Sequence, residues 1–380
     1  MKIEIWHNIM WSKYKAVVFS ELNNLCSKLG HSLNVFQFGE TEGNRVNLSG
    51  IDKSYHEYEY KLLFKGSLDK IPVWKRIFVA ARWTALSKAN VIVLAGYDKP
   101  EYWVQLLILK FKSSKIGVFC DSTAFDNPQT RIKSMFKSAF LRSCDRVFCY
   151  GIRAKEYVMS FGVREEKISF RCQSAALPKD YDRSLITDKR VQSRKLLSNS
   201  PRLLYVGRLS PEKSLDVLIE SWSRYIENSP NATLRIVGSG PQEEFLKVLT
   251  KRLNLGASVN FLGPKSGDDL YKEYLDASAL ILPSYSEPWG LVVNEAFSFG
   301  CPAIVSNRCG CVPELVIEDI TGISFDLFDP NGLYNALLRA EALFTHSVAE
   351  TSSKCLSLIQ RYSPSAAAED IYNGLVSLVR

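Results

Sequence analysis

The stretch 286–302, SEPWGLVVNEAFSFGCP, places two glutamates around the start of a predicted helix. It follows a short apolar strand predicted at 279–284, and Gly290 marks the expected beginning of the helix. Glu287 then lies in the loop and Glu295 in the second helical turn. The N–H groups that open a helix lack intrahelical partners and favour an anionic ligand. The two carboxylates suit the hydroxyls of a ligand and the N–H groups suit its phosphate, although each carboxylate alone is typical of a solvated surface.

Short apolar runs alternate with helix-length amphipathic stretches on both sides of this loop, which is the pattern of a parallel sheet covered by helices. The expected strands of the first half lie at 2–6, 33–38, 91–96, 115–120, 146–150 and 168–171. Those of the second half lie at 202–207, 233–238, 259–263, 279–284, 302–306 and 321–326. The fold class is therefore α/β, with a doubly wound sheet in each half. Ligands of such sheets bind beyond the carboxyl ends of the strands.

The length of 380 residues fits two domains. We expect residues 1–185 to form the first domain and residues 200–361 the second. The segment 186–199 is polar and shows no sustained apolar period, so it is predicted to be the linker.

Two further strand-end loops of the second half carry groups suited to phosphate. The stretch 206–214, VGRLSPEKS, holds Arg208 and Lys213 five residues apart, so both can reach one anion over the following helix N-terminus. The stretch 238–241, GSGP, permits close approach of the backbone. It does not complete the dinucleotide fingerprint GxGxxG, because residue 243 is glutamate. The alternative for Arg208 and Lys213 is that they are solvated surface cations. The alternative for 238–241 is that it is a structural turn only.

Taken in order, the motifs GR, K, GxGP, FLG and EPWGLVVNEA resemble those of the family 4 retaining glycosyltransferases of the GT-B fold, also described as glycosyl transferases group 1. The signature of that family is two glutamates separated by seven residues, as seen at Glu287 and Glu295. The resemblance runs from about residue 200 to the C-terminus, and the first half matches only in architecture. It implies two Rossmann-like domains facing a central cleft, with the C-terminal helix at about 362–380 crossing back onto the first domain.

The resemblance also implies a role for each matching residue. Arg208 and Lys213 would bind the donor diphosphate, and Glu287 would contact hydroxyls of the transferred sugar, which makes these three the catalytic set. Glu295 would hold the ribose of the donor. The remaining residues implied to bind the donor are Gly207, Gly238, Gly240, Leu262, Trp289, Gly290 and Leu291. No cofactor and no metal is expected, because basic residues replace the metal in this family.

The acceptor side departs from the family pattern. Many members have a glycine-rich loop after the first strand, whereas the corresponding stretch here is 7–14, HNIMWSKY. A histidine often follows a middle strand of the first domain, where this chain offers Asp121. Ser12 and Asp121 are therefore the acceptor-side candidates. The four histidines, at 7, 31, 56 and 346, have no zinc-site spacing, and Cys309-Gly310-Cys311 lacks a second ligand pair.

The positive charge of the chain is concentrated in its first half. Residues 1–200 hold 33 Lys and Arg against 19 Asp and Glu, a net charge of +14, whereas residues 201–380 hold 15 against 21, a net charge of −6. The stretches 73–88 and 129–142 are basic and amphipathic, so they could lie on an anionic membrane or pack on the sheet. The sequence shows neither a membrane span nor a signal peptide. We expect a cytoplasmic protein, peripheral on the inner face of the membrane.

The resemblance thus implies an enzyme that moves a sugar from a UDP- or GDP-linked donor to a hydroxyl of a glycan or lipid-linked acceptor, in bacterial cell-surface polysaccharide synthesis. A nucleotide-sugar isomerase or a phosphorylase of the same fold is the alternative. A glycoside hydrolase could use two glutamates, but Arg208 and Lys213 would then be unexplained. A nucleic-acid partner is not expected, since no binding motif is visible and the second half is acidic.

Overall fold

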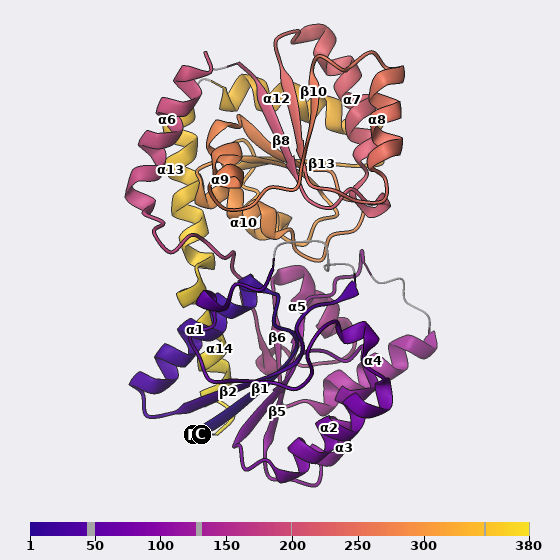
Figure 1. Ribbon diagram of the computed structural model, residues 1–380, viewed down its shortest axis with the longest axis vertical. Coiled ribbons are helices and arrows are strands. Elements are labelled where there is room, and N and C mark those ends of the chain that lie inside the picture. The colour runs from indigo at the N-terminus through magenta and orange to yellow at the C-terminus, as the bar shows by residue number, and fades with distance from the viewer. Residues whose placement is uncertain (44–49, 127–130, 199, 346, 380) are drawn as a thin grey trace. The chain divides into compact units, whose positions relative to one another are not determined.

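The computed structural model describes residues 1–43, 50–126, 131–198, 200–345 and 347–379 (Figure 1). The chain divides into two compact units. Unit 1 comprises Met1–Ala176 together with Tyr362–Arg380, and unit 2 comprises Leu177–Arg361. Four predicted features touch positions outside the described residues: residues 129 and 130 of the basic stretch, residue 199 of the linker, His346, and residue 380 of the last helix.

Unit 1 contains a 7-stranded sheet in the order β3-β2-β1-β4-β5-β6-β7, and every pairing is parallel. The strands are β1 (Lys2–Ile9), β2 (Ser32–Gly39), β3 (Tyr60–Leu62), β4 (Val91–Leu94), β5 (Lys115–Cys120), β6 (Arg146–Cys149) and β7 (Ile168–Ser169). The six expected strands are present. The edge strand β3 was not expected, because three largely exposed residues carry no apolar signal.

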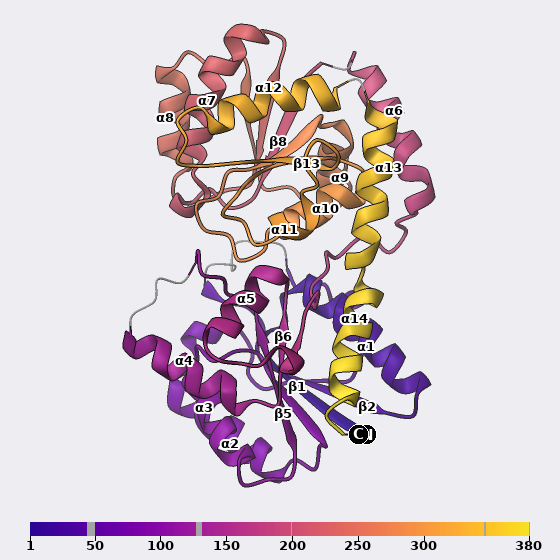
Figure 2. The same cartoon turned by 180° about the vertical axis from the view of Figure 1, so that it is seen from behind.

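Helices cover both faces of this sheet (Figure 2). On one face lie α1 (Lys13–Lys28) and α14 (Pro364–Val376), which pack against each other. On the other lie α2 (Val73–Leu86), α3 (Pro100–Leu109), α4 (Arg131–Ser143) and α5 (Ile152–Ser160). The last helix of the chain thus belongs to unit 1, where Asp370 forms an ion pair with Arg171 at 3.1 Å.

Unit 2 contains a 6-stranded parallel sheet in the order β10-β9-β8-β11-β12-β13. The strands, all expected from their apolar runs, are β8 (Arg202–Val206), β9 (Thr233–Val237), β10 (Val259–Gly263), β11 (Ala279–Leu282), β12 (Ala303–Ser306) and β13 (Gly322–Phe325). Every residue of β11 and β12 is buried, as a sheet covered on both faces requires.

The helices of unit 2 form two groups. One face carries α7 (Leu215–Asn228), α8 (Glu243–Arg252) and α12 (Gly332–Phe344). The second group contains α6 (Ile186–Leu196), α9 (Gly267–Asp276), α10 (Leu291–Ser298) and α13 (Val348–Ile359), which pack on one another. A short helix, α11, spans Val312–Leu315. Short 3₁₀ helices lie at Lys53–Tyr55, Leu68–Lys70, Glu165–Lys167, Arg183–Leu185, Pro211–Lys213 and Gln360–Tyr362. Within the described ranges, no helix is both long and apolar enough to cross a bilayer.

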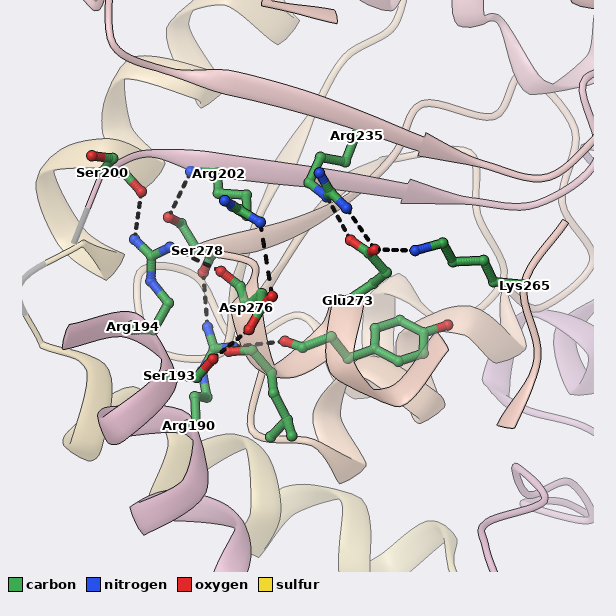
Figure 3. Close-up of polar contacts among 12 residues, drawn as sticks. Arg190, Ser193, Arg194, Ser200, Arg202, Arg235, Lys265, Glu273, Asp276 and Ser278 are labelled. Atoms are coloured by element: carbon green, nitrogen blue, oxygen red, sulfur yellow. Dashed lines mark hydrogen bonds and ion pairs between the residues drawn. The ribbon is translucent and has the colours of Figure 1, made fainter. Parts of the chain in front are cut away.

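The structure corrects the linker prediction at 186–199, because this segment forms helix α6 and the division between the units falls after residue 176. Arg190 and Arg194 of α6 are buried and donate to backbone carbonyls near the end of α9 (Figure 3). Arg190 reaches the carbonyl oxygens of Tyr274 at 2.8 Å and Ser278 at 3.1 Å. Helix α6 is therefore held by its two guanidinium groups, which cap backbone carbonyls near the end of α9. Contacts of this kind produce no periodic apolar pattern in the sequence.

A second cluster shown in Figure 3 holds the other side of α9. Glu273 of α9 accepts from Arg235 of β9 at 2.5 Å and from Lys265 at 2.5 Å. Burial alone would raise the pKa of Glu273, but these two cations bring it below its usual range. The helix is thus fixed between α6 and the sheet by charged groups.

Replacing Arg190 by methionine should lower the free energy of unfolding by about 3 kcal/mol, since several buried carbonyls lose their donor. The change is measured by urea unfolding. Lys189→Met, at an exposed position of the same helix, is the matched control and should change stability little. Equal unfolding midpoints for the two variants would contradict the capping role.

Candidate functional site

The loop after β9 lies directly on the loop after β8 because two of its residues are glycines. A Cβ at Gly238 would stand 1.8 Å from the carbonyl oxygen of Gly207, and one at Gly240 would stand 2.3 Å from that of Leu209. The N–H of Leu209 donates to the carbonyl of Ser239 at 3.0 Å. Glycine is required here for contact between two backbones, so these glycines fix the loop after β8.

Lys213 and Glu287 come from loops 74 residues apart and form an ion pair, with 2.5 Å between Nζ and Oε2. Their side chains are only 15% and 17% exposed. The loops are also joined through the backbone, since the N–H of Tyr285 donates to the carbonyl of Glu212 at 2.9 Å. The structure therefore brings these two predicted site residues together at the carboxyl ends of the adjacent strands β8 and β11.

Arg208 stands on the same turn but is more open to solvent. Its side chain is 49% exposed, and its Nη2 lies 2.8 Å from Oε1 of Glu212. The hydroxyl of Ser210 donates to the same oxygen at 2.6 Å. An exposed ion pair of this kind is weak, so the guanidinium can turn to another anion at small cost.

The start of helix α10 depends on Gly290. This residue has φ +106°, and a Cβ there would be 2.8 Å from the side chain of Leu282. The helix then begins at Leu291. Trp289 is buried, and its Nε1 donates to the side chain of Asn294 at 2.7 Å. Of these residues predicted to bind the donor, Trp289 can therefore offer only its backbone.

The stretch 309–311 supports the Glu287 loop. The N–H of Gly310 donates to the carbonyl of Glu287 at 2.9 Å. A Cβ at Gly310 would stand 1.8 Å from the carbonyl oxygen of Pro288, so only glycine fits. Across the described residues, no three His, Cys, Asp or Glu side chains gather in a way that could hold a metal ion.

Glu295 has a partner that the sequence analysis missed. The hydroxyl of Tyr274, a fully buried residue of α9, donates to Oε2 of Glu295 at 2.7 Å. Burial raises the pKa of Glu295, and the bond from Tyr274 acts in the opposite direction. A tyrosine 21 residues upstream carries no local motif, so only the α9–α10 packing reveals it.

The remaining predicted residues lie at two places. Leu262 is half-buried in β10, next to Gly263, whose carbonyl accepts from the N–H of Gly238 at 2.9 Å. In unit 1, Ser12 is the N-cap residue of α1 and Asp121 directly follows β5. Ser12 and Asp121 line one cavity of that unit.

Residues 187–343 match the sequence family described as Glycosyl transferases group 1. An uncharacterized glycosyltransferase from Methanocaldococcus jannaschii is 32% identical over 173 residues, which are 44% of this chain and 44% of that protein. The D-inositol 3-phosphate glycosyltransferase of Corynebacterium diphtheriae is 32% identical over 148 residues, 37% of this chain and 34% of that protein. The chain thus spans less than half the length of these relatives.

The whole chain is similar in fold to a solved structure, Anabaena HepE in complex with UDP and glucose. The TM-score is 0.71 at 18% identity, over 99% of this chain and 100% of that one. This likeness confirms the predicted fold of two doubly wound Rossmann-like domains. The matched segment includes Arg208, Lys213, Glu287 and Glu295. The segment that matches Glycosyl transferases group 1 therefore lies within unit 2.

Proposed function

We propose that the protein is a family 4 retaining glycosyltransferase. It moves a sugar from a UDP- or GDP-linked donor to a hydroxyl of a glycan or lipid-linked acceptor, in bacterial cell-surface polysaccharide synthesis. The observation that carries this proposal is the ion pair between Lys213 and Glu287 at the carboxyl end of the sheet, within the segment that matches the glycosyltransferase family. The two relatives are named as glycosyltransferases, and HepE holds UDP and glucose, which supports a nucleotide-sugar donor.

The chemistry of transfer explains why a cation and a carboxylate share this site. Breaking the bond between sugar and phosphate develops negative charge on the leaving diphosphate, which Lys213 and Arg208 would stabilise without a metal. Glu287 would accept hydrogen bonds from hydroxyls of the transferred sugar. In the structure each charge of the Lys213–Glu287 pair compensates the other. A bound donor supplies phosphate to one and hydroxyls to the other, so neither charge is left uncompensated.

We also propose that unit 1 binds an anionic membrane surface through α2, α3 and α4. Counted by unit, unit 1 holds 28 Lys and Arg against 18 Asp and Glu, a net charge of +10, and unit 2 holds 20 against 22, a net charge of −2. Each basic helix packs on the unit through part of its surface, since Ala80 of α2 and Phe140 and Leu141 of α4 are buried. Ile132, Met135 and Phe136 of α4 are exposed. Trp74 and Phe78 of α2 are exposed as well.

Phe111, two residues after the end of α3, is 92% exposed as well. Lys75 on α2 and Lys133 on α4 lie in the same helices as the exposed apolar residues. Apolar side chains interspersed with cations are suited to the headgroup region of an anionic bilayer. Peripheral attachment would bring the enzyme to a lipid-linked acceptor.

Nucleotide sugars should raise the melting temperature of the protein, because a ligand that binds only the native state stabilises it. A panel of UDP- and GDP-sugars is measured by thermal shift in excess EDTA. We expect at least one member to raise the Tm by several degrees and Lys213→Ala to abolish that rise. Lys247→Ala, which removes an exposed lysine paired with Glu243 on α8, is the control. No shift with any member would refute the donor assignment, and a shift seen only without EDTA would refute metal independence.

Removing the Tyr274 hydroxyl should weaken donor binding about tenfold, the equivalent of about 1.4 kcal/mol, because Glu295 loses a hydrogen bond. The pKa of Glu295 should then rise further, since that bond favours the charged form. As the pH is lowered, donor affinity should therefore begin to fall at a higher pH in Tyr274→Phe than in the wild type. Donor Kd is measured from pH 5 to 8, with Tyr334→Phe on α12 as control. Parallel pH profiles would contradict this role.

Trp74→Ser combined with Phe78→Ser should reduce recovery with anionic liposomes in a flotation assay. Each exposed aromatic that enters the interface contributes about 1.5–3 kcal/mol when fully buried, so a loss of tenfold or more is expected. Phe245→Ser, at an exposed aromatic of unit 2, is the matched control. Unchanged recovery of the double variant, or equal wild-type recovery with neutral liposomes, would argue against this surface.

A further inference from the structure

The loop that carries Glu287 connects β11 to α10, and its backbone holds it against the turn after β8. The N–H groups of Tyr285 and Ser286 both donate to the carbonyl of Glu212, at 2.9 and 3.3 Å. Strand β11 lies between β8 and β12 in the sheet, so the loop has a second neighbour on its other flank, the turn after β12. Because Glu287 follows Tyr285 by two residues, contacts on that flank also decide where its carboxylate stands.

Arg308, in the turn after β12, holds the loop from this second flank. Its Nε donates to the carbonyl oxygen of Tyr285 at 2.6 Å. The central carbon of its guanidinium lies 4.3 Å from the ring centre of Tyr285 and 5.3 Å from that of Phe328, a residue that follows β13. Aromatic rings attract such a cation, and a hydrogen bond from a charged donor is stronger than one between neutral groups. Tyr285 is therefore bound through both its carbonyl and its ring.

The two rings of this cluster add little to the hydrophobic core of unit 2. Tyr285 is 46% exposed and Phe328 is 64% exposed, and the rings contact each other edge to face, with 6.1 Å between their centres. Apolar surface stabilises a fold when it is removed from water, and these rings keep much of theirs in water. The contacts of Arg308 are therefore better suited to fixing the path of one loop than to stabilising the unit as a whole.

The backbone that follows Arg308 continues the same contact toward the site. Cys309 pairs with Glu287 in an isolated parallel β-bridge, and the N–H of Gly310 donates to the carbonyl of Glu287. The turn after β12 thus runs alongside the loop, with a side-chain bond at Tyr285 and a backbone bond at Glu287. The turn therefore fixes the segment that leads into Glu287 as well as Glu287 itself.

We propose that Arg308 is a positioning residue that places Glu287 for contact with the transferred sugar, an inference that rests on the proposed transferase function. Site residues have to be held within about 0.5 Å of their working geometry, and Arg308 supplies part of that restraint. Glu287 is assigned to the sugar hydroxyls, whereas the diphosphate is assigned to Lys213 and Arg208. Removing Arg308 should therefore weaken the binding of a nucleotide sugar much more than the binding of the same nucleotide diphosphate.

The test compares Arg308→Met with the wild type by isothermal titration calorimetry, with UDP-glucose, UDP-galactose and GDP-mannose set against UDP and GDP. We expect the Kd of each nucleotide sugar that the wild type binds to rise at least tenfold, and the Kd of the matching diphosphate to change less than twofold. Arg224→Met is the matched control, because the guanidinium carbon of Arg224 on α7 also lies 4.3 Å from the centre of an aromatic ring, that of Tyr334. This control should change neither Kd.

A second comparison asks whether Arg308 acts through Glu287. Added to Glu287→Gln, Arg308→Met should weaken nucleotide-sugar binding less than twofold further, since residues that act through one another give non-additive losses. Arg308→Lys keeps a cation that can donate to the carbonyl of Tyr285, and it should bind nucleotide sugars at least threefold more tightly than Arg308→Met. Additive losses, no recovery with lysine, unchanged affinity in Arg308→Met, or equal losses for diphosphate and nucleotide sugar would each overturn the positioning role.

Folding and donor binding are followed separately. The Tm of every variant is recorded without ligand. If Arg308→Met does not fold, Arg308→Lys replaces it, and its loss of affinity should again be confined to nucleotide sugars. A wild type that binds a nucleotide sugar leaves the proposed function intact whatever the variants show. A wild type that binds no nucleotide sugar would refute the proposed function, and the positioning role with it.

Discussion

The contact between the backbones of Gly238 and Gly207 is the constraint on which the candidate donor site depends. Any side chain at residue 238 would overlap the Gly207 carbonyl, so the loops after β8 and β9 can lie against each other only with glycine there. That contact sets the path of the turn that carries Arg208 and Lys213. The ion pair from Lys213 to Glu287 then ties this turn to the loop after β11. Three strand-end loops thus support one another through contacts within the chain itself.

Much of this arrangement could be predicted from the sequence, because the strands of unit 2 are apolar runs and the site residues follow them directly. The two errors have a common cause. Helix α6 is held by Arg190 and Arg194 through carbonyls of a distant helix end, and β3 is short and exposed. Both are positioned by contacts with other segments rather than by a periodic apolar face. Local sequence patterns do not indicate contacts between segments that are distant in the sequence.

The same reason explains which site residues were missed. Tyr274 and Gly310 act on Glu295 and Glu287 from α9 and from the turn after β12, and neither belongs to a recognisable motif. The burial of Lys15 was not predicted either, because a lysine in a first helical turn is ordinarily solvated. Its burial depends on Phe119 and Tyr150, which come from two other strand ends. Ser12 and Asp121 were identified only because they lie where this sequence departs from the pattern of the family.

The division of the chain has a consequence for how the protein is made. Unit 2 is one continuous segment, whereas unit 1 is completed by the last residues of the chain. Ile371 and Leu375 of α14 are fully buried in the core that also holds Ile5 and Phe19. During translation, the ribosome releases all of unit 2 before it releases the helix that closes this core. The N-terminal part of unit 1 therefore cannot complete its core until α14, which follows unit 2 in the sequence, has been synthesised.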